Sequence, residues 1–237
     1  MITKILKQVK QYRHAKLRHR RMKAFYSMLL SSGDSVMDIG ANRGLYTKMF
    51  LNIGAKVLSV EPHPDCLVAL HQIKSPSLTI LPLAVSDKIG VQSFMLCNED
   101  EVSTLSTEFK EEFNKQDFLN WDQEISVETT TLDAIIKQHG LPDYLKLDIE
   151  GYEHLVLSRL SLAVNLISFE YTYPFRNHAE TCINHIDRIG NYVYNYYQFE
   201  SFEFELDSWV SSETMIQILQ QMDSTFLVGD IYARRQS

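Results

Sequence analysis

Cysteine is scarce in this sequence, because the 237 residues include only Cys66, Cys97 and Cys182. These three are odd in number and far apart, so the chain has neither a disulfide framework nor a CxxC motif for metal or redox chemistry. Glycine and proline are also few, at 9 and 6 residues, which excludes collagen-like and low-complexity chains. These absences predict a globular protein of a reducing compartment.

Long apolar runs are missing as well. No segment approaches the roughly 18 to 20 apolar residues that cross a bilayer, and the N-terminus lacks the apolar centre of a secretory signal. The composition, 45% hydrophobic and 22% charged, is that of a packed globular domain. We therefore predict a cytoplasmic protein without a membrane span.

Acidic residues are absent from the first 23 positions, although the whole chain has a net charge of −7. Nine of the 23 Lys and Arg lie there, which leaves 14 against all 30 Asp and Glu in the rest of the chain. Apolar residues recur in this stretch at steps of three and four, which predicts one apolar stripe on a cationic helix. They are Ile2, Ile5, Leu6, Val9 and Tyr12. We divide the chain into a basic helical extension, residues 1–33, and one globular domain, residues 34–237.

Three surroundings fit such a helix. The stripe can pack on the domain while the charges stay solvated, and this is the interpretation that we favour. The helix can instead make peripheral contact with an anionic membrane through residues 1–23. Contact with nucleic-acid phosphates is the least favoured of the three.

From residue 34 onward, short β-branched segments alternate with helical patterns. This alternation predicts an α/β fold, in which a mostly parallel sheet carries helices on both faces. Strands are predicted at residues 35–39, 56–60, 78–87, 125–130, 144–148, 166–171, 192–197 and 225–232. The helix after the first strand should begin near Gly44 with Leu45, Met49 and Ile53 inward, and Thr131 should cap a later helix.

One segment interrupts the pattern. Residues 90–97 alternate enough for an added hairpin strand, whereas residues 98–124 contain nine acids and two lysines without a clear period. Loops of this length inside a domain usually have a function of their own. We expect this acidic insertion to form a lid or loop.

Candidate ligand-binding residues stand where the predicted strands end, because ligands of an open parallel sheet bind beyond those ends. The first strand runs into the turn Asp38-Ile-Gly-Ala-Asn-Arg-Gly44, whose small residues allow close approach of a ligand. Glu61 ends the second strand, 23 residues after Asp38, near the interval expected for an acid that binds ribose hydroxyls. Turn and acid together predict a nucleoside ligand.

The turn differs from a dinucleotide-binding turn at Asn42, where the dinucleotide motif has glycine. The pyrophosphate of NAD needs close backbone approach at that position, and the Asn42 side chain opposes it. S-adenosylmethionine has no phosphate, and its positive charges are favoured by nearby acids such as Asp38 and Asp148. The strand ends therefore predict S-adenosylmethionine as the cofactor.

Five motifs, in this order, resemble one known family. They are Val36–Gly44, Val60–Pro62, Ala84–Asp87, Thr131–Asp133 and Leu145–Glu153. The chain from about residue 34 to residue 171 resembles the FkbM-type S-adenosylmethionine-dependent methyltransferases, mostly O-methyltransferases of sugars and natural products. The resemblance implies the Rossmann-like, seven-stranded class I methyltransferase fold and O-methylation of a hydroxyl on a saccharide or natural-product acceptor.

The resemblance also implies which residues bind the cofactor. The turn after the first strand is expected around the methionine part, through Asp38, Gly40, Ala41, Asn42 and Gly44. Glu61 is expected on the ribose, and Ser86 or Asp87 near the adenine.

Methyl transfer to oxygen requires an aligned acceptor and the loss of its proton. Asp148 and Glu150 follow one predicted strand and Glu170 ends the next, so each is a candidate catalytic base or acceptor-orienting group. The same three carboxylates can chelate a divalent metal, but no histidine pattern supports this and we do not favour a metal. Glu153 and His154 are expected to lie exposed at a helix start.

A second class of function competes with catalysis. In this alternative the chain is a non-catalytic methyltransferase-like module that binds RNA or anionic membrane through its basic helix. The intact set of Asp38, Gly40 and Glu61 favours the enzyme. Methylation of adenine amino groups is disfavoured, because residues 148–151 read Asp-Ile-Glu-Gly instead of the Asn/Asp-Pro-Pro-Tyr pattern of such enzymes.

Overall fold

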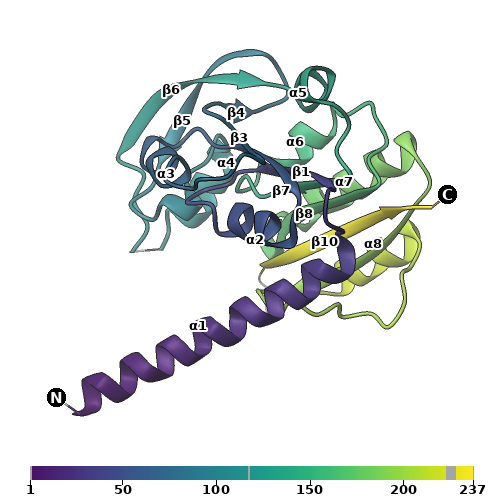
Figure 1. The fold of residues 1–237 in the computed structure, drawn as a ribbon. Helices are drawn as coiled ribbons and strands as arrows, with labels where there is room; N and C mark the ends of the chain where they lie inside the picture. Colours follow the sequence, from purple (N-terminus) through teal and green to yellow (C-terminus); the bar gives the residue numbers. More distant parts are fainter. Residues whose placement is uncertain (1, 117, 223–227, 237) are drawn as a thin grey trace.

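The computed structural model of the protein describes residues 2–116, 118–222 and 228–236. A seven-stranded sheet with helices on both faces forms the centre, and a smaller sheet lies at one side of it (Figure 1). The helices are α1 (Ile2–Leu29), α2 (Leu45–Ile53), α3 (Pro64–Leu70), α4 (Thr107–Phe113), α5 (Leu132–His139), α6 (Glu153–Leu157), α7 (Arg176–Ile189) and α8 (Ser212–Gln221), with 3-10 turns η1 (Asp100–Val102) and η2 (Tyr173–Phe175).

The large sheet has the strand order β3-β2-β1-β7-β8-β10-β9. Its strands are β1 (Ser35–Ile39), β2 (Lys56–Val60), β3 (Leu78–Leu81), β7 (Tyr144–Leu147), β8 (Leu166–Thr172), β9 (Tyr192–Gln198) and β10 (Val228–Arg235). β10 is antiparallel to both neighbours, and the other pairings are parallel. The predicted α/β fold with a mostly parallel seven-stranded sheet is confirmed. Because the strand order reverses between β1 and β7, a crevice opens beyond their C-terminal ends.

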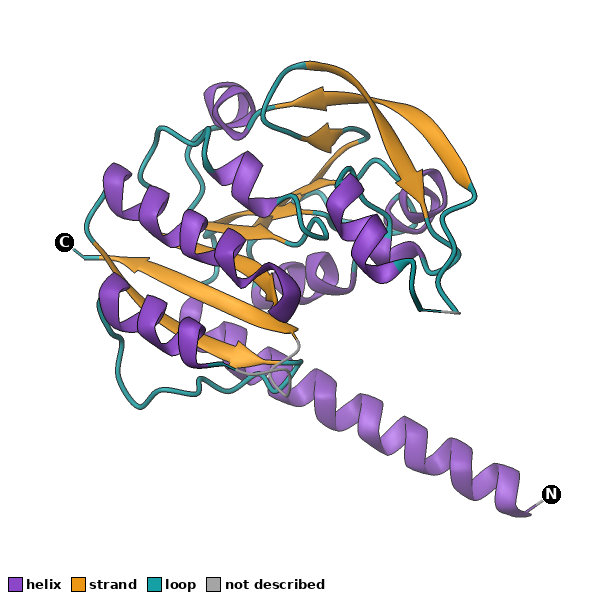
Figure 2. Ribbon diagram, turned by 180° about the vertical axis from the view of Figure 1, so that it is seen from behind, coloured by secondary structure: helices purple, strands orange, loops and turns teal. Residues whose placement is uncertain are grey.

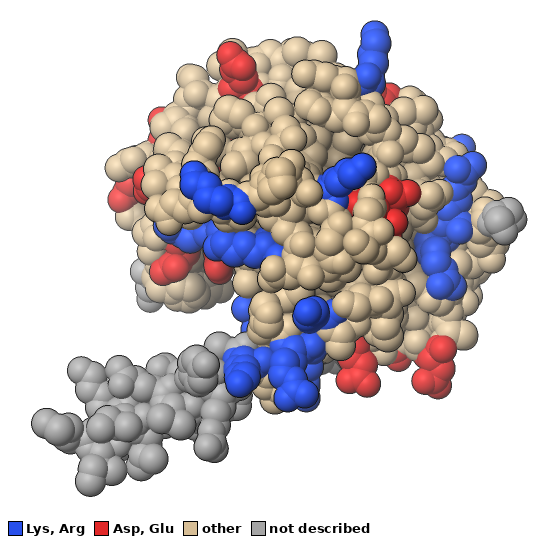
Figure 3. Space-filling view, viewed as in Figure 1, with Lys and Arg blue, Asp and Glu red and all other residues tan. Residues whose placement is uncertain are grey.

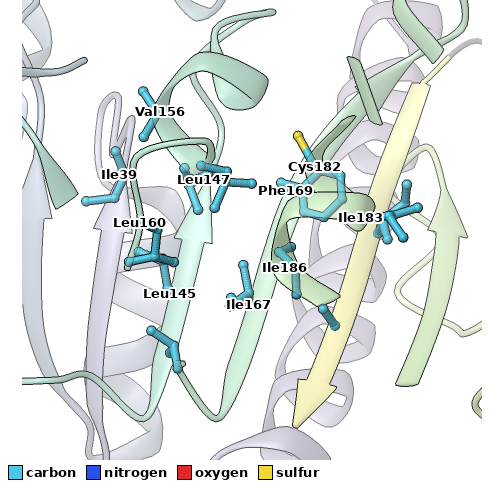
Figure 4. Close-up of a cluster of buried hydrophobic side chains, with 14 of the residues drawn as sticks. Ile39, Leu145, Leu147, Val156, Leu160, Ile167, Phe169, Cys182, Ile183 and Ile186 are labelled. Carbon is cyan, nitrogen blue, oxygen red and sulfur yellow. The ribbon is translucent and has the colours of Figure 1, made fainter. Parts of the chain in front are cut away.

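Two cores cover the faces of this sheet, since successive side chains of a strand point to opposite faces. On one face, Ile39, Leu147 and Phe169 of three adjacent strands meet Val156 of α6 and Ile183 of α7 (Figure 4). On the other face, α1 and α2 pack on a core rich in tyrosine and phenylalanine. The strand predicted at 192–197 is β9, and its tyrosines are buried in both cores.

The smaller sheet has the order β4-β6-β5, from β4 (Ala84–Val85), β5 (Gly90–Leu96) and β6 (Gln123–Thr130). β5 pairs antiparallel with β6, which confirms the predicted hairpin strand. The third predicted strand ends at Leu81, because the chain then leaves the large sheet and Ala84–Val85 pairs with β6. The acidic insertion is partly helical and contains η1 and α4.

Helix α1 extends from the domain as one rod of 28 residues, and its N-terminal part points away in both ribbon views (Figures 1 and 2). Its C-terminal end is built into the domain, because Met22, Phe25 and Tyr26 are buried in the aromatic core. The hydroxyl oxygens of Tyr26 and Tyr232 of β10 lie 3.1 Å apart. Among the described residues, the structure has no helix with the length and hydropathy to span a membrane.

Most predicted boundaries agree with the structure, with local exceptions. Thr131 caps α5, where its hydroxyl accepts the backbone N–H of Ala134. Met49 of α2 is buried as predicted, but the inward prediction for Leu45 was wrong, because 43% of it is exposed beside the crevice. The first residues of the last predicted strand, 225–227, lie outside the described residues.

Candidate active site

Two adjoining cavities lie beyond the ends of β1 and β7. They share Gly40, Asn42, Glu101, Asp148 and Glu150 in their walls. The β2-side cavity continues along the end of β2 and the small sheet. The β10-side cavity continues toward α1 and the end of β10. The crevice therefore has two adjoining compartments with different linings.

The turn after β1 brings the chain against the end of β7. Gly40 has a left-handed φ of 79°, and a Cβ built on it would lie 1.8 Å from the backbone oxygen of Asp148. The backbone N–H groups of Gly40 and Ala41 both donate to the carbonyl oxygen of Val60. Asn42 is also left-handed, with a φ of 46°, a conformation that asparagine tolerates better than most residues. Only glycine fits at position 40, and the turn that it permits forms the wall between the two cavities.

Glu61 follows β2 and lines the β2-side cavity with 5% of its surface exposed. Its two carboxylate oxygens accept the backbone N–H groups of Asn42 and His63, each at 2.7 Å. Burial raises the pKa of Glu61 to about 7, although the two amides lower it. Glu61 thus stands at the cavity wall, at the position predicted for a ribose-binding acid.

One part of the β2-side cavity is an apolar slot. Val60, Pro62, Leu83, Val85 and Phe94 line it. An adenine ring requires such a slot, with few polar groups to orient it. Phe94 was not predicted to line a binding site, because it comes from the small sheet and reaches the cavity only through tertiary packing.

Asp38 lies behind the turn and is fully buried, outside the walls of both cavities. The Thr47 hydroxyl donates to its Oδ2 at 2.7 Å, whereas its Oδ1 has no hydrogen-bond partner among the described residues. Burial raises the pKa of Asp38, and the charge of Lys146 opposes this. Gly44 also lies behind the turn, where a Cβ would meet the side chains of Ile73 and Leu70. Of the turn residues predicted for the cofactor, Gly40, Ala41 and Asn42 line a cavity.

Ser86 and Asp87 lie one layer behind the β2-side cavity. The Ser86 hydroxyl donates to Asp87 Oδ1 at 3.0 Å, and the Tyr152 hydroxyl donates to the same oxygen at 3.4 Å. Tyr152 itself lines the cavity. The predicted adenine-side residues therefore orient Tyr152, which the sequence analysis did not single out.

Three carboxylates gather in the β10-side cavity, as the strand-end positions predicted. One oxygen from each of Asp148, Glu150 and Glu170 lies within 4.8 Å of the others. Burial, followed by the neighbouring carboxylates, raises the pKa values of Glu150 and Glu170 well above the usual range. Close carboxylates of this kind share protons, so the cluster can accept or hold a proton at neutral pH. Three oxygen ligands could also hold a divalent cation, which stays the less favoured interpretation.

Lys146 supplies the positive charge beside this cluster. Its ammonium group is buried, donates to Asp148 Oδ2 at 2.7 Å and lies 4.2 Å from the centre of the Tyr46 ring. Burial lowers the pKa of Lys146, but Asp148 and Tyr46 outweigh this and hold it well above the usual value. Lys146 was not among the predicted site residues. The feature of the sequence that could have identified it is its position inside the otherwise apolar strand Tyr-Leu-Lys-Leu.

The acidic insertion covers the β2-side cavity. Asp100 of η1 forms an ion pair with Arg43 of the turn. The Thr104 hydroxyl donates to the backbone oxygen of Glu150 at 2.8 Å, and Phe109 of α4 packs on Gly151. The insertion is thus attached to both walls of the crevice.

The expectation of an exposed Glu153 was wrong, because only 5% of its surface is accessible. Its Oε1 accepts the backbone N–H of Ile149 at 2.8 Å, so Glu153 stabilises the turn that carries Glu150. Burial raises the pKa of Glu153 to about 7, and burial likewise lowers that of the neighbouring His154 to about 4.

We expect Glu153→Gln to flatten the pH dependence of stability. The folded protein holds a proton on Glu153 up to about pH 7, whereas the unfolded chain releases it near its ordinary pKa of 4.5. The proton on Glu153 therefore contributes fully to the free energy of unfolding below about pH 4.5. This stabilisation, about 3 kcal/mol at most, is lost as the pH rises through 7. Urea unfolding from pH 5 to pH 8 measures it, with the exposed Glu128→Gln as the control. Equal pH slopes in the two variants would contradict the assignment.

The comparison with family models identifies the family of this chain. Residues 38–222 match the family described as the methyltransferase FkbM domain. Among solved structures, a TehB-like SAM-dependent methyltransferase from Corynebacterium glutamicum has a TM-score of 0.48 at 10% identity, covering 91% of this chain and 88% of that one. An rRNA methylase from Streptococcus thermophilus has a TM-score of 0.45 at 9% identity, covering 91% and 94%. No curated protein matches the sequence significantly.

The strand order and the crevice define a class I methyltransferase, whose methyl donor is S-adenosylmethionine. The match covers most of the chain, and the protein belongs to the FkbM methyltransferase family.

Proposed function

We propose that the protein transfers a methyl group from S-adenosylmethionine to a hydroxyl of a saccharide or similar polyhydroxylated acceptor. The observation that carries the proposal is the carboxylate cluster Asp148, Glu150 and Glu170, which lies next to the turn at Gly40. Carboxylate oxygens accept hydrogen bonds from hydroxyl groups, and they can also take up the proton that an alcohol must lose.

The residues of the β2-side cavity fit the methyl donor. Glu61 offers a buried carboxylate for two ribose hydroxyls, and the slot around Val85 and Phe94 suits the adenine. In this proposal the methionine part lies at the turn, where Gly40 and Asn42 line both cavities. When bound, S-adenosylmethionine supplies an electrophilic methyl group on a positively charged sulfur. Carboxylates at the shared wall of the cavities stabilise that charge.

The β10-side cavity fits a polar acceptor. Tyr46 and Phe199 offer aromatic surface, and Glu200 and Asp230 add acceptors beside the cluster. In this proposal the paired Lys146 holds one oxygen of Asp148, so the other oxygen orients the acceptor hydroxyl. Burial raises the pKa values of Glu150 and Glu170, so these carboxylates take up a proton more readily than ordinary glutamates.

Calorimetry followed by transfer assays tests the proposal. We expect the protein to bind S-adenosylmethionine and not NAD, and to transfer a labelled methyl group to members of a panel of sugars. Failure to bind the methyl donor would refute the proposal. Donor binding without transfer to any acceptor would favour the non-catalytic alternative.

Asp148→Asn is expected to lower kcat on the order of 100-fold, because the acceptor hydroxyl loses the group that aligns it with the methyl group and with the neighbouring carboxylates. The donor Kd should rise by a much smaller factor, because the variant removes one of the carboxylates near the positive sulfur while Glu61 and the apolar residues of the slot stay intact. The exposed Asp207→Asn is the matched control. A merely structural Asp148 would give a lower melting temperature with unchanged kcat and pH profile, which would remove the residue from the mechanism.

A further inference from the structure

Helix α1 is attached to the domain at only one of its ends. Its last turns are fixed in the domain by Met22, Phe25 and Tyr26, whereas its N-terminal part lies away from the domain in both ribbon views (Figures 1 and 2). The helix nevertheless continues without a break from Ile2 to Leu29. A helix of this length outside the domain needs a partner surface to stabilise it.

The charge of α1 indicates the sign of that surface. The nine Lys and Arg of residues 1–23 have no acidic residue among them. Exposed bases gather on the surface where α1 meets the domain, and they include Lys16, Arg20, Arg21 and Lys23 (Figure 3). In the projecting part, the sequence interleaves lysines with an apolar stripe, the pattern of helices that lie in a lipid interface. An RNA-binding helix needs the charges but not the stripe.

The β10-side cavity opens at the same end of the molecule. Arg18 of α1 lines this cavity and forms an ion pair with Glu200. Apolar side chains are exposed there as well: Leu45 and Phe199 line the cavity with 43% and 50% of their surfaces exposed, and Leu17, next to Arg18, is 48% exposed. An apolar rim beside a cationic helix is the arrangement expected of a protein surface that meets lipid.

We propose that α1 docks the protein on an anionic lipid bilayer and that the β10-side cavity then opens toward the membrane surface. The docking does not depend on the proposed function. The further statement, that the acceptor is attached to a lipid at this membrane surface, does rest on the proposed function. The lining of the cavity argues against an RNA acceptor, because the carboxylates of Glu101 and Glu200 disfavour a phosphodiester chain there. A neutral sugar carried on a lipid meets no such repulsion.

Vesicle flotation of the full-length chain tests the docking. We expect binding to phosphatidylcholine vesicles that contain about one quarter phosphatidylglycerol, and little binding to phosphatidylcholine alone. The triple variant Lys4→Glu, Lys7→Glu, Lys10→Glu should lower the partition coefficient on the order of 100-fold or more. A control with the same charge change, Lys56→Glu, Lys88→Glu, Lys137→Glu, should bind like the wild type, because these exposed lysines lie outside α1.

A second variant separates lipid insertion from charge alone. Ile5→Ser, Leu6→Ser, Val9→Ser keeps every base and should also lose vesicle binding on the order of 10-fold or more. Vesicle binding that survives either α1 variant, or RNA binding without vesicle binding, would overturn the proposal. The donor Kd, measured by calorimetry on the same variants without vesicles, should be unchanged, so a failure of docking is distinguished from a failure of the methyltransferase proposal.

Discussion

Gly40→Ala should destabilise the protein by more than about 3 kcal/mol and abolish measurable donor binding. The added Cβ would lie 1.8 Å from the backbone oxygen of Asp148, so the ends of β1 and β7 would have to separate. The left-handed φ of 79° adds strain of roughly 1 kcal/mol for any residue with a Cβ. Because the turn forms the wall between the two cavities, the separation would disrupt both.

The control variant Gly33→Ala separates the effect of backbone strain from the effect of the steric clash. Gly33 has a comparable φ of 97°, but a Cβ there would meet no atom within 4 Å. This control should lose only about 1 kcal/mol and should bind the donor normally. Urea unfolding and calorimetry on both variants give the comparison. Equal destabilisation by the two substitutions would show that the close approach of Gly40 to Asp148 contributes nothing.

Removal of the Glu61 carboxylate is the change with the largest expected effect on the donor. Glu61→Ala should weaken binding by a factor on the order of 100 to 10000, because two hydrogen bonds to a charged acceptor each contribute about 1.5 to 3 kcal/mol. Glu61→Gln keeps the size and one acceptor, so it should give a smaller loss. Glu128→Gln serves as the exposed control for the same chemical change.

Glu61 also holds the backbone of Asn42 and His63, so its role on the ribose needs its own readout. A donor analogue without the 2′ and 3′ hydroxyls should bind the wild type much more weakly than the complete donor, yet Glu61→Ala should hardly distinguish the two. A variant that still discriminates them would leave Glu61 only a structural role.

The raised pKa of Glu61 predicts how donor binding responds to pH. With a pKa of about 7 in the free protein, the carboxylate that accepts ribose hydroxyls becomes the main form only above that pH. Donor affinity should therefore rise from pH 6 to pH 8 and then level off, and Glu61→Gln should remove this rise. Calorimetry in buffers of matched ionic strength measures it.

The sequence was sufficient where local pattern controls structure. β1 and β2 have the predicted boundaries, because each is a short apolar run that ends at a turn or at an acid. Thr131 caps α5 through a contact within four residues, which the sequence can specify by itself. The order of motifs along the chain likewise predicted the family and the strand ends that carry Glu61 and Asp148, and the strand pattern at 166–171 predicted the position of Glu170.

The sequence failed where burial depends on distant segments. Leu45 was expected to be buried and Glu153 to be exposed, and both expectations were wrong. Leu45 lies beside the crevice and is exposed there, whereas Glu153 is buried because it accepts the backbone N–H of Ile149. Tyr152 becomes part of the cavity wall through Asp87, 65 residues away. Such contacts depend on how the two sheets and the acidic insertion pack together.

The chain by itself therefore determined the succession of strands and helices, the acids at the strand ends and the cationic character of α1, since these depend on neighbouring residues. Only the tertiary structure decided which acids share a cavity, that Lys146 pairs with Asp148, and that Arg18 of α1 lines the site. The physical reason is that side-chain burial and charge pairing follow distances in space, and the strand order brings together segments that lie far apart along the chain.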